Sequence, residues 1–340
     1  MNNNEIEYDR DKDRQGLFDE EFFKQSYKNN LWFLEIGLEA VKNNPEDRPE
    51  TLVDSLYLLT VTEYTAGHPI EAVYQRFEQA IEYSNLCLAI DAKHPIDDPE
   101  LIEDGWTMSV WGGGMDLSES LPNAIGWCIL FDRTDWLSIV KRCYELDGFR
   151  DVAFDALVNT RIPTEFDPKQ KFPKGGFNFR KPLLQAIMAE SKEETLKHLN
   201  SYLAGWYEGN RKIGNGIIDR HLDQDPEYGG YYGYWSFESA AVAYLKDIDD
   251  TELRQYLYYP KDMVDWAREQ RRIKQSEEQD NNRLPLLLPK GAIAPFAGKY
   301  GIDNFIGHEI MVEQGERLPA GRVSAQYDEN GEPLYREDTI

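Results

Sequence analysis

The periodicity of the apolar residues in the amino-terminal part of the chain constrains its fold most strongly. Between Glu20 and Asn44 these residues are three or four positions apart, which places them on one face of an α-helix. They are Phe23, Tyr27, Leu31, Leu34, Leu38 and Val41. Similar patterns predict helices from Leu52 to Tyr64 and from Val73 to Ala92, separated by short segments that contain Pro or Gly. Because short loops join antiparallel neighbours, we expect three antiparallel helices here.

Helical patterns continue over most of the chain and are interrupted near its middle. The segment from Arg161 to Pro182 is rich in Pro, Gly and basic residues, so we expect a boundary between two helical sets there. Further helices are predicted at 117–130, around 136–140, and at 149–157, 183–189, 193–207, 234–245, 251–258 and 262–272.

The carboxyl-terminal part differs in composition. After the hydrophilic run IKQSEEQDNNR, which we interpret as a break, residues 284–340 hold seven Gly and five Pro. Ile310 to Val312 is typical of a strand, and Asn330-Gly331 is typical of a hairpin turn. The predicted fold class is all-α, with two packed sets of antiparallel helices and a small irregular, partly β extension. The predicted domains are an N-terminal helical domain at 1–160, a C-terminal helical domain at 183–272 and the extension at 284–340.

The charge of the chain limits the kinds of partner it can have. Its 340 residues include 62 acidic and 37 basic ones, which leaves a formal net charge of −25. A pI near 4.6 argues against direct binding to nucleic acid or to an anionic membrane, since both carry the same sign of charge. Apolar residues make up 41% of the chain, which is enough to build a core. We therefore expect a folded acidic protein whose partner is a basic protein or a cationic ligand.

The cysteines and the amino terminus indicate a cytoplasmic protein. Cys87, Cys128 and Cys143 form an odd set without CxxC spacing, and each lies in an apolar helical context, so we expect reduced core thiols. The first residues contain no apolar signal region, and no run of 18 apolar residues occurs. Neither export nor a membrane span is therefore expected.

No residue pattern indicates catalysis, a metal site or a cofactor. The five histidines form neither HExxH nor a pair at helical spacing, and the acidic run from Asp219 to Glu227 does not match an EF-hand loop. Gly112-Gly113-Gly114 lacks the Lys-Ser/Thr of a P-loop, and no GxSxG elbow is present. We predict no catalytic residue, no metal and no cofactor, and so no enzyme. Two alternatives stay open: a helical-barrel glycan-processing enzyme with two catalytic carboxylates, and a generic helical protein-binding adaptor.

The most distinctive segment is GYWSFESAA at 233–241, followed by DIDD at 247–250 and YYPKD at 258–262. Its apolar residues define the inward face of a helix, on which small Ala side chains admit a close neighbour. Asp249 or Asp250 is placed to cap the next helix. Glu238 lies among apolar residues, so we expect a buried polar anchor with a hydrogen-bonding or cationic partner.

These motifs resemble the C-terminal domain of the PoNi-type immunity proteins, which protect bacteria from PoNe-type DNase toxins. WYEG at 206–209 belongs to the same pattern, and Arg10-Asp11 and EEFF at 20–23 resemble the start of that family's N-terminal domain. The resemblance covers roughly residues 10–272, with its specific motif between 206 and 262, and leaves out 284–340. It implies an all-α protein that binds and blocks a cognate nuclease toxin, often one delivered by a type VI secretion system, without chemistry of its own.

The acidic charge agrees with this resemblance. Nuclease domains present basic grooves to phosphate backbones, so an inhibitor that covers such a groove should be acidic and should associate quickly. The segment from His94 to Asp132 contains eight acidic residues and no Lys or Arg. We predict that acids of this segment and of the loop before the GYW motif bind the partner, together with aromatic anchors. These residues are Asp97, Asp98, Glu100, Glu103, Asp104, Trp106, Trp111, Asp219, Asp223, Asp225, Glu227 and Tyr231.

Overall fold

The computed structural model describes most of the helical part of the chain and short stretches of its carboxyl end. The described residues are 8–45, 49–93, 117–146, 151–164, 166–172, 176–214, 218–225, 229–282, 293, 298–302, 309–313, 315–317 and 323–327. The chain forms two compact units, Met1–Arg268 and Glu269–Ile340.

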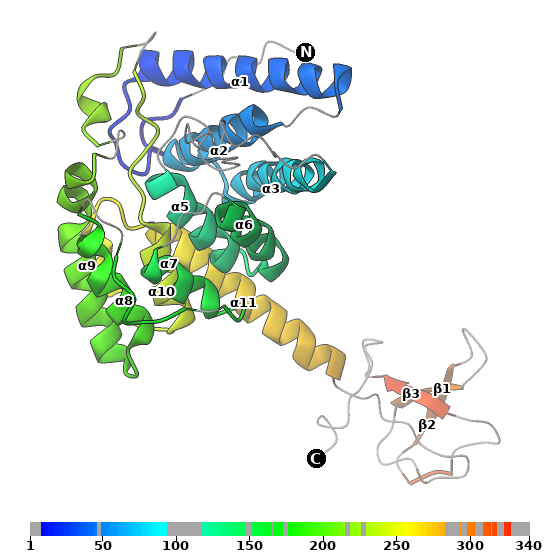
Figure 1. The fold of residues 1–340 in the computed structure, drawn as a ribbon. Helices are drawn as coiled ribbons and strands as arrows, with labels where there is room; N and C mark the ends of the chain where they lie inside the picture. The colour runs from blue at the N-terminus through cyan, green and yellow to red at the C-terminus, as the bar shows by residue number, and fades with distance from the viewer. Residues whose placement is uncertain are drawn as a thin grey trace. The chain divides into compact units, whose positions relative to one another are not determined.

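The first unit is built from helices (Figure 1). Its α-helices are α1 Glu20–Asn43, α2 Glu50–Thr65, α3 Ile70–Lys93, α5 Leu117–Leu130, α6 Thr134–Leu146, α7 Val152–Asn159, α8 Lys181–Met188, α9 Lys192–Lys212 and α10 Phe237–Leu245. Three short 3-10 helices accompany them: η1 Phe177–Arg180, η2 Arg220–Leu222 and η3 Thr251–Gln255. The last helix, α11 Lys261–Asn282, begins in this unit and continues into the second.

The first three helices pack in sequence order, α1 against α2 and α2 against α3 (Figure 1). α1 begins after Asp19, whose carboxylate accepts a hydrogen bond from the backbone N–H of Phe22 at 3.0 Å. Residue 37 is a glycine because α2 lies so near: a Cβ there would be 2.4 Å from Leu52 Cδ2. The helices predicted from apolar spacing in this part of the chain are confirmed.

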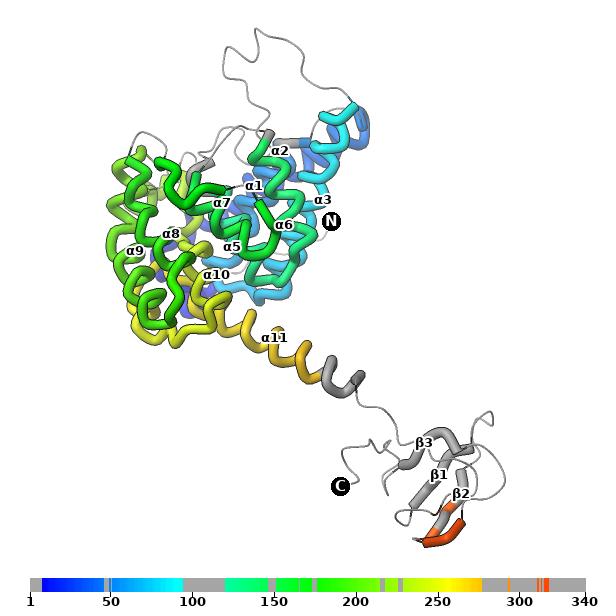
Figure 2. Tube along the Cα trace, turned by 60° about the horizontal axis from the view of Figure 1, so that its bottom comes forward, coloured from blue at the N-terminus to red at the C-terminus, as the bar shows by residue number. Residues whose placement is uncertain are grey.

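The second half of the unit shares a core with the first half. α10 packs against α5 so closely that a Cβ on Gly126 would lie 2.6 Å from the carbonyl carbon of Phe237. The Phe237 ring is 4.9 Å from that of Trp127 and 5.1 Å from that of Tyr64, centroid to centroid. On the other side α8 lies beside α9, as Figures 1 and 2 both show. The division into two helical domains stays a prediction, and the two helical sets meet in one apolar cluster.

A buried ion pair fixes the connection between α7 and α8. Asp151 and Arg180 are 2% and 1% exposed, and Arg180 Nη1 lies 2.9 Å from Asp151 Oδ2. Asp151 Oδ1 also accepts a hydrogen bond from the backbone N–H of Ala153 at 2.9 Å, which caps α7. The Arg180 guanidinium lies over the Phe154 ring, 4.5 Å from its centroid. The segment predicted as a loop, 161–182, therefore includes the 3-10 helix η1, whose last residue is the ion-paired Arg180.

Helix α11 corrects one sequence interpretation. The hydrophilic run that we expected to be a break is helical as far as Asn282. From Glu269 to Asn282 the sequence has no Pro and no Gly and is rich in Glu, Gln, Arg and Lys, which favour a helix even without an apolar face.

The second unit contains a three-stranded antiparallel sheet with strand order β2-β1-β3. Its strands are β1 Gly298–Ile302, β2 Glu309–Val312 and β3 Val323–Tyr327, with Tyr300 opposite both Ile310 and Gln326. The register shifts between Tyr300 and Ile302, which marks an irregularity in the ladder. The strand expected at Ile310 is confirmed, and the hairpin expected at Asn330-Gly331 lies outside the described residues. The all-α fold class with a small partly β extension is thus confirmed.

The cysteines lie in the interior of the helical unit. Cys87, Cys128 and Cys143 are buried and make no disulfide. Burial raises the pKa of the Cys128 thiol well above its usual value, which keeps it protonated. Among the described helices, none combines the length and the apolar run that crossing a bilayer requires.

Candidate partner-binding surface

The motif helix α10 buries its carboxylate rather than presenting it. Glu238 is 1% exposed, and its Oε1 accepts hydrogen bonds from Tyr202 Oη at 2.7 Å, Trp206 Nε1 at 3.1 Å and Ser236 Oγ at 2.7 Å. Because Tyr202 and Trp206 lie one turn apart on α9, this one oxygen joins α9 to the start of α10. Burial, and then the neighbouring Glu238 carboxylate, raise the pKa of Tyr202 well above its usual value. The expectation of a buried, hydrogen-bonded Glu238 is confirmed.

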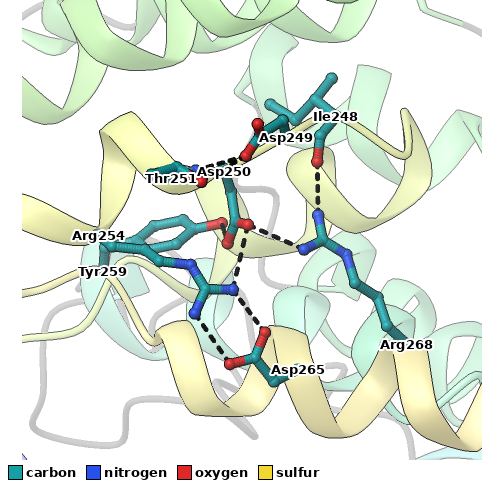
Figure 3. A network of polar contacts seen from close by, with 8 residues as sticks. All are labelled: Ile248, Asp249, Asp250, Thr251, Arg254, Tyr259, Asp265 and Arg268. Carbon is teal, nitrogen blue, oxygen red and sulfur yellow. Dashed lines mark hydrogen bonds and ion pairs between the residues drawn. The ribbon is translucent and has the colours of Figure 1, made fainter.

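The DIDD motif is a second structural junction, shown in Figure 3. Asp250 accepts hydrogen bonds from Tyr259 Oη at 2.9 Å, Arg268 Nη1 at 2.8 Å and Arg254 Nη2 at 3.2 Å. Burial alone would raise the pKa of Asp250, but the hydrogen bond and charge of Arg268 outweigh it and hold the pKa below its usual value. Asp249 accepts from the Thr251 backbone N–H at 3.0 Å, which forms a tight turn just before η3, whose N-cap residue is Asp250. These acids hold η3 and α11 together.

Arg14 holds the segment before α1 against the end of α2 and the start of α11. Its guanidinium donates to Asp262 at the start of α11, to the carbonyl oxygen of Tyr64 and, at 3.1 Å, to that of His68. Arg14 and Asp262 are 248 residues apart in the sequence. This segment therefore ties the end of α2 to the last helix of the unit.

The next residue, Gln15, also binds this part of the chain, and its side chain holds Tyr231 in place by a hydrogen bond. Gln15 Oε1 accepts hydrogen bonds from Tyr231 Oη at 2.7 Å and from the Tyr234 backbone N–H at 2.9 Å. Tyr231 is 1% exposed and lies edge-on to Phe18, 5.0 Å away between ring centroids. The structure thus corrects the assignment of Tyr231 as an aromatic anchor: its ring fills the core, because the amino-terminal segment covers it.

The acidic loop before the motif is only partly free to meet a partner. Asp219 accepts hydrogen bonds from Arg211 Nε at 3.0 Å and Tyr207 Oη at 2.9 Å. The Arg211 hydrogen bonds, followed by that of Tyr207, hold the pKa of Asp219 below its usual value. Asp223 and Asp225 are exposed. Asp219 therefore orients the loop, and Asp223 leaves an exposed carboxylate on it.

This loop is held against the start of α1. Gln224 Nε2 donates to the Leu17 carbonyl oxygen at 2.7 Å, and its Oε1 accepts from the Asp19 backbone N–H at 2.8 Å. Gly229 lies so close to Phe22 that a Cβ on the glycine would be 2.5 Å from Phe22 Cε2. The acidic loop and α1 thus form one continuous part of the surface.

The side of α1 away from α2 carries apolar residues that the sequence reasoning missed. Trp32 and Phe33 are each 55% exposed and Ile36 is 45% exposed, whereas Leu34 is buried. The rings of Trp32 and Phe33 are in contact, with centroids 5.0 Å apart. The signal was present in the sequence, since these three residues fall between the positions of the core stripe rather than on it.

Most of the predicted partner-binding residues lie outside the described residues and stay predictions. These are Asp97, Asp98, Glu100, Glu103, Asp104, Trp106, Trp111 and Glu227. In the part of the chain that the structure describes, no three His, Cys, Asp or Glu side chains are grouped so that they could hold a metal ion.

Comparison with known proteins agrees with the motif. Residues 151–263 match the family described as PoNe immunity proteins (PoNi), C-terminal. The crystal structure of protein PA2201 from Pseudomonas aeruginosa is similar with a TM-score of 0.54 at 15% sequence identity, over 74% of this chain and 90% of that chain. No curated protein matches the sequence. The resemblance to the PoNi C-terminal domain is confirmed over 151–263, which includes the whole motif from 206 to 262, and the likeness to PA2201 concerns the fold.

Proposed function

We propose that this protein is an immunity protein that binds a cognate PoNe-type DNase toxin in the cytoplasm and neutralises it. The match of residues 151–263 to the PoNi C-terminal family is the observation that carries this proposal. That segment contains the Glu238 and Asp250 junctions, so the carboxylates of the motif serve to build the helical frame. Inhibition then depends on the surface that this frame presents.

The net charge of −25 supports a cationic partner. A nuclease binds phosphate backbones through basic side chains, and an acidic protein approaching that surface is attracted over a Debye length of about 8–10 Å. Such steering raises the association rate, which suits an inhibitor that must capture its toxin before DNA is cut. The exposed carboxylate of Asp223 supports this role.

The motif carboxylates favour inhibition by binding over catalysis by this chain. A glycan-processing enzyme needs two carboxylates that face a common substrate. Glu238 instead faces Tyr202, Trp206 and Ser236 in the interior, and Asp250 faces two arginines and a tyrosine. Glu238 Oε1 and the Asp250 carboxylate thus hold helices together, and Glu238 Oε2 is buried without a hydrogen-bond partner among the described residues.

The experiment is a titration of a purified PoNe-type DNase domain with the purified full-length protein. We expect plasmid degradation to stop at a one-to-one ratio and the association rate to fall steeply between about 50 and 500 mM salt. An unrelated acidic protein of similar net charge, at the same concentration, is the control for non-specific charge effects. Undiminished DNA degradation at equimolar or higher ratios would reject the proposal.

A further inference from the structure

Helix α1 is apolar on two opposite sides, and only one of them is covered by the described residues. Phe23, Tyr27 and Leu34 are buried on the inner side, where α2 packs. Trp32 points about 200° away from Leu34 at 100° per residue, and it is 55% exposed. Exposed apolar patches on soluble proteins mark interaction sites.

The acidic loop lies on the same stripe of α1 as the exposed aromatic residues. Phe22 and Phe33 are eleven residues apart, which is about three turns, so their side chains point within about 20° of each other and about 16 Å apart along the axis. Gly229 of the loop covers Phe22, while Phe33 is 55% exposed. Between these two phenylalanines the same side of α1 carries Gln25, Ser26 and Asn29, so the exposed patch of Trp32, Phe33 and Ile36 lies on the loop side of the helix, about two polar turns beyond the loop.

The charges around this stripe favour a cationic occupant. Glu35 and Glu39 are exposed one turn apart beside Trp32 and Ile36, and neither carboxylate has a hydrogen bond or ion pair with any residue that the structure describes. Like charges at this spacing destabilise a helix by a few tenths of a kcal/mol. The stability of α1 alone therefore does not explain the pair. The bases of the helix on either side of this patch are Lys28, one turn before Trp32, and Lys42, three residues after Glu39. A second copy would bring another −25 charge against this surface, which disfavours self-association.

We propose that this side of α1 is the apolar centre of the toxin-binding surface. We call it the α1 outer face and define it as Trp32, Phe33 and Ile36 with the flanking Glu35 and Glu39. Its occupant is a cationic protein surface with an apolar recess, which on the function proposed above belongs to the cognate nuclease. Large aromatic side chains at the centre of an interface commonly carry most of its binding energy, and surrounding acids contribute to the association rate.

The test compares full-length variants in binding to the purified nuclease domain. The double variant Trp32→Ala/Phe33→Ala should bind at least about 30-fold more weakly, mainly through faster dissociation. Glu35→Gln/Glu39→Gln should slow association at low salt and leave dissociation nearly unchanged. Met188→Ala and Leu257→Ala are matched controls, since these side chains are 49% and 48% exposed on other elements, and each should change the dissociation constant less than about threefold.

The outcomes separate this inference from the proposed function. If the wild-type protein neither binds nor inhibits the nuclease, the proposed function fails. If the wild-type protein inhibits and the Trp32→Ala/Phe33→Ala variant binds equally well, the function stands and the α1 outer face is refuted as its centre. A wild-type dimer in light scattering that this variant converts to a monomer would identify a second copy as the occupant instead. If the Trp32→Ala/Phe33→Ala variant melts more than a few degrees below the wild type, part of the same chain covers the α1 outer face, and the inference is refuted.

Discussion

Breaking the buried pair of Asp151 and Arg180 should cost far more stability than breaking the exposed pair of Lys192 and Asp247. The two side chains are 0% and 1% exposed and 2.9 Å apart. Removing one partner of such a pair leaves the other charge buried and uncompensated, at a cost of about 3–5 kcal/mol. Because a domain is stable by only about 5–15 kcal/mol, one neutralising substitution should remove a large share of the total.

Three variants separate the charge from the helix cap. Asp151→Asn retains a side chain that can cap α7 and should lose about 3 kcal/mol or more, whereas Asp151→Ala should lose about 1 kcal/mol beyond that. Asp151→Asn combined with Arg180→Met removes both charges, and we expect it to be more stable than Asp151→Asn alone. The control is Lys192→Met, whose partner Asp247 is 3.0 Å away in a pair that is 64% and 71% exposed, and whose loss should cost less than about 1 kcal/mol.

The measurement is urea unfolding followed by far-ultraviolet circular dichroism, which reports on the helices. If Asp151→Asn changes the free energy of unfolding by less than about 1 kcal/mol, the reasoning from burial is wrong. If it does not fold at all, the double variant decides the matter: recovery of helical structure would support the loss of the Asp151 charge beside buried Arg180 as the cause, and no recovery would contradict it.

Three further predictions concern other parts of the helical unit. Gly126→Ala should lower the melting temperature because its Cβ would meet the backbone of α10 at 2.6 Å, whereas Gly205→Ala in α9, with no neighbouring atom within 4 Å, should gain up to about 1 kcal/mol; equal effects in thermal denaturation would contradict this. Burial lowers the pKa of His68 from its usual 6.5, so the stability due to neutral His68 is present above about pH 6.5 and is lost as the pH falls through the lowered folded-state pKa. The free energy of unfolding should accordingly fall less for His68→Gln than for the wild type between about pH 7.5 and 5, and parallel losses would exclude this role. Tyr231→Phe should cost about 1 kcal/mol by removing a donor to Gln15, with nuclease inhibition unchanged; weakened inhibition without a loss of stability would return Tyr231 to the interface.

The helices of the first half were predictable because their core residues repeat at a helical spacing. In α1 the stripe from Phe23 to Leu34 lies on the side that packs against α2, as expected. The burial of Glu238 was predictable for a similar reason, since apolar neighbours on a short helix leave a carboxylate no route to water. Its donors on α9 were not, because nothing in the local sequence fixes which helix will be the neighbour.

The errors arose where distant segments determine the outcome. Tyr231 follows an acidic, Gly-rich loop and was expected at the surface, but Gln15 and Phe18 cover it. Trp32 and Phe33 were passed over because a pattern search for one core stripe ignores apolar residues off that stripe. The run after Arg272 was interpreted as a break from its polarity, although high helix propensity is independent of an apolar face.

The bonds of Arg14 and Gln15 set the order in which the molecule can be completed during synthesis. Arg14 leaves the ribosome early, but its partner Asp262 is translated 248 residues later, roughly 12–50 s at 5–20 residues per second. Until then Arg14 has only the carbonyl oxygens of Tyr64 and His68 as partners, and the ion pair with α11 is missing. A chain arrested before residue 262 would therefore lack the bond between its amino-terminal segment and the last helix of the unit, and it would offer an unfinished helical unit to a toxin already inside the cell.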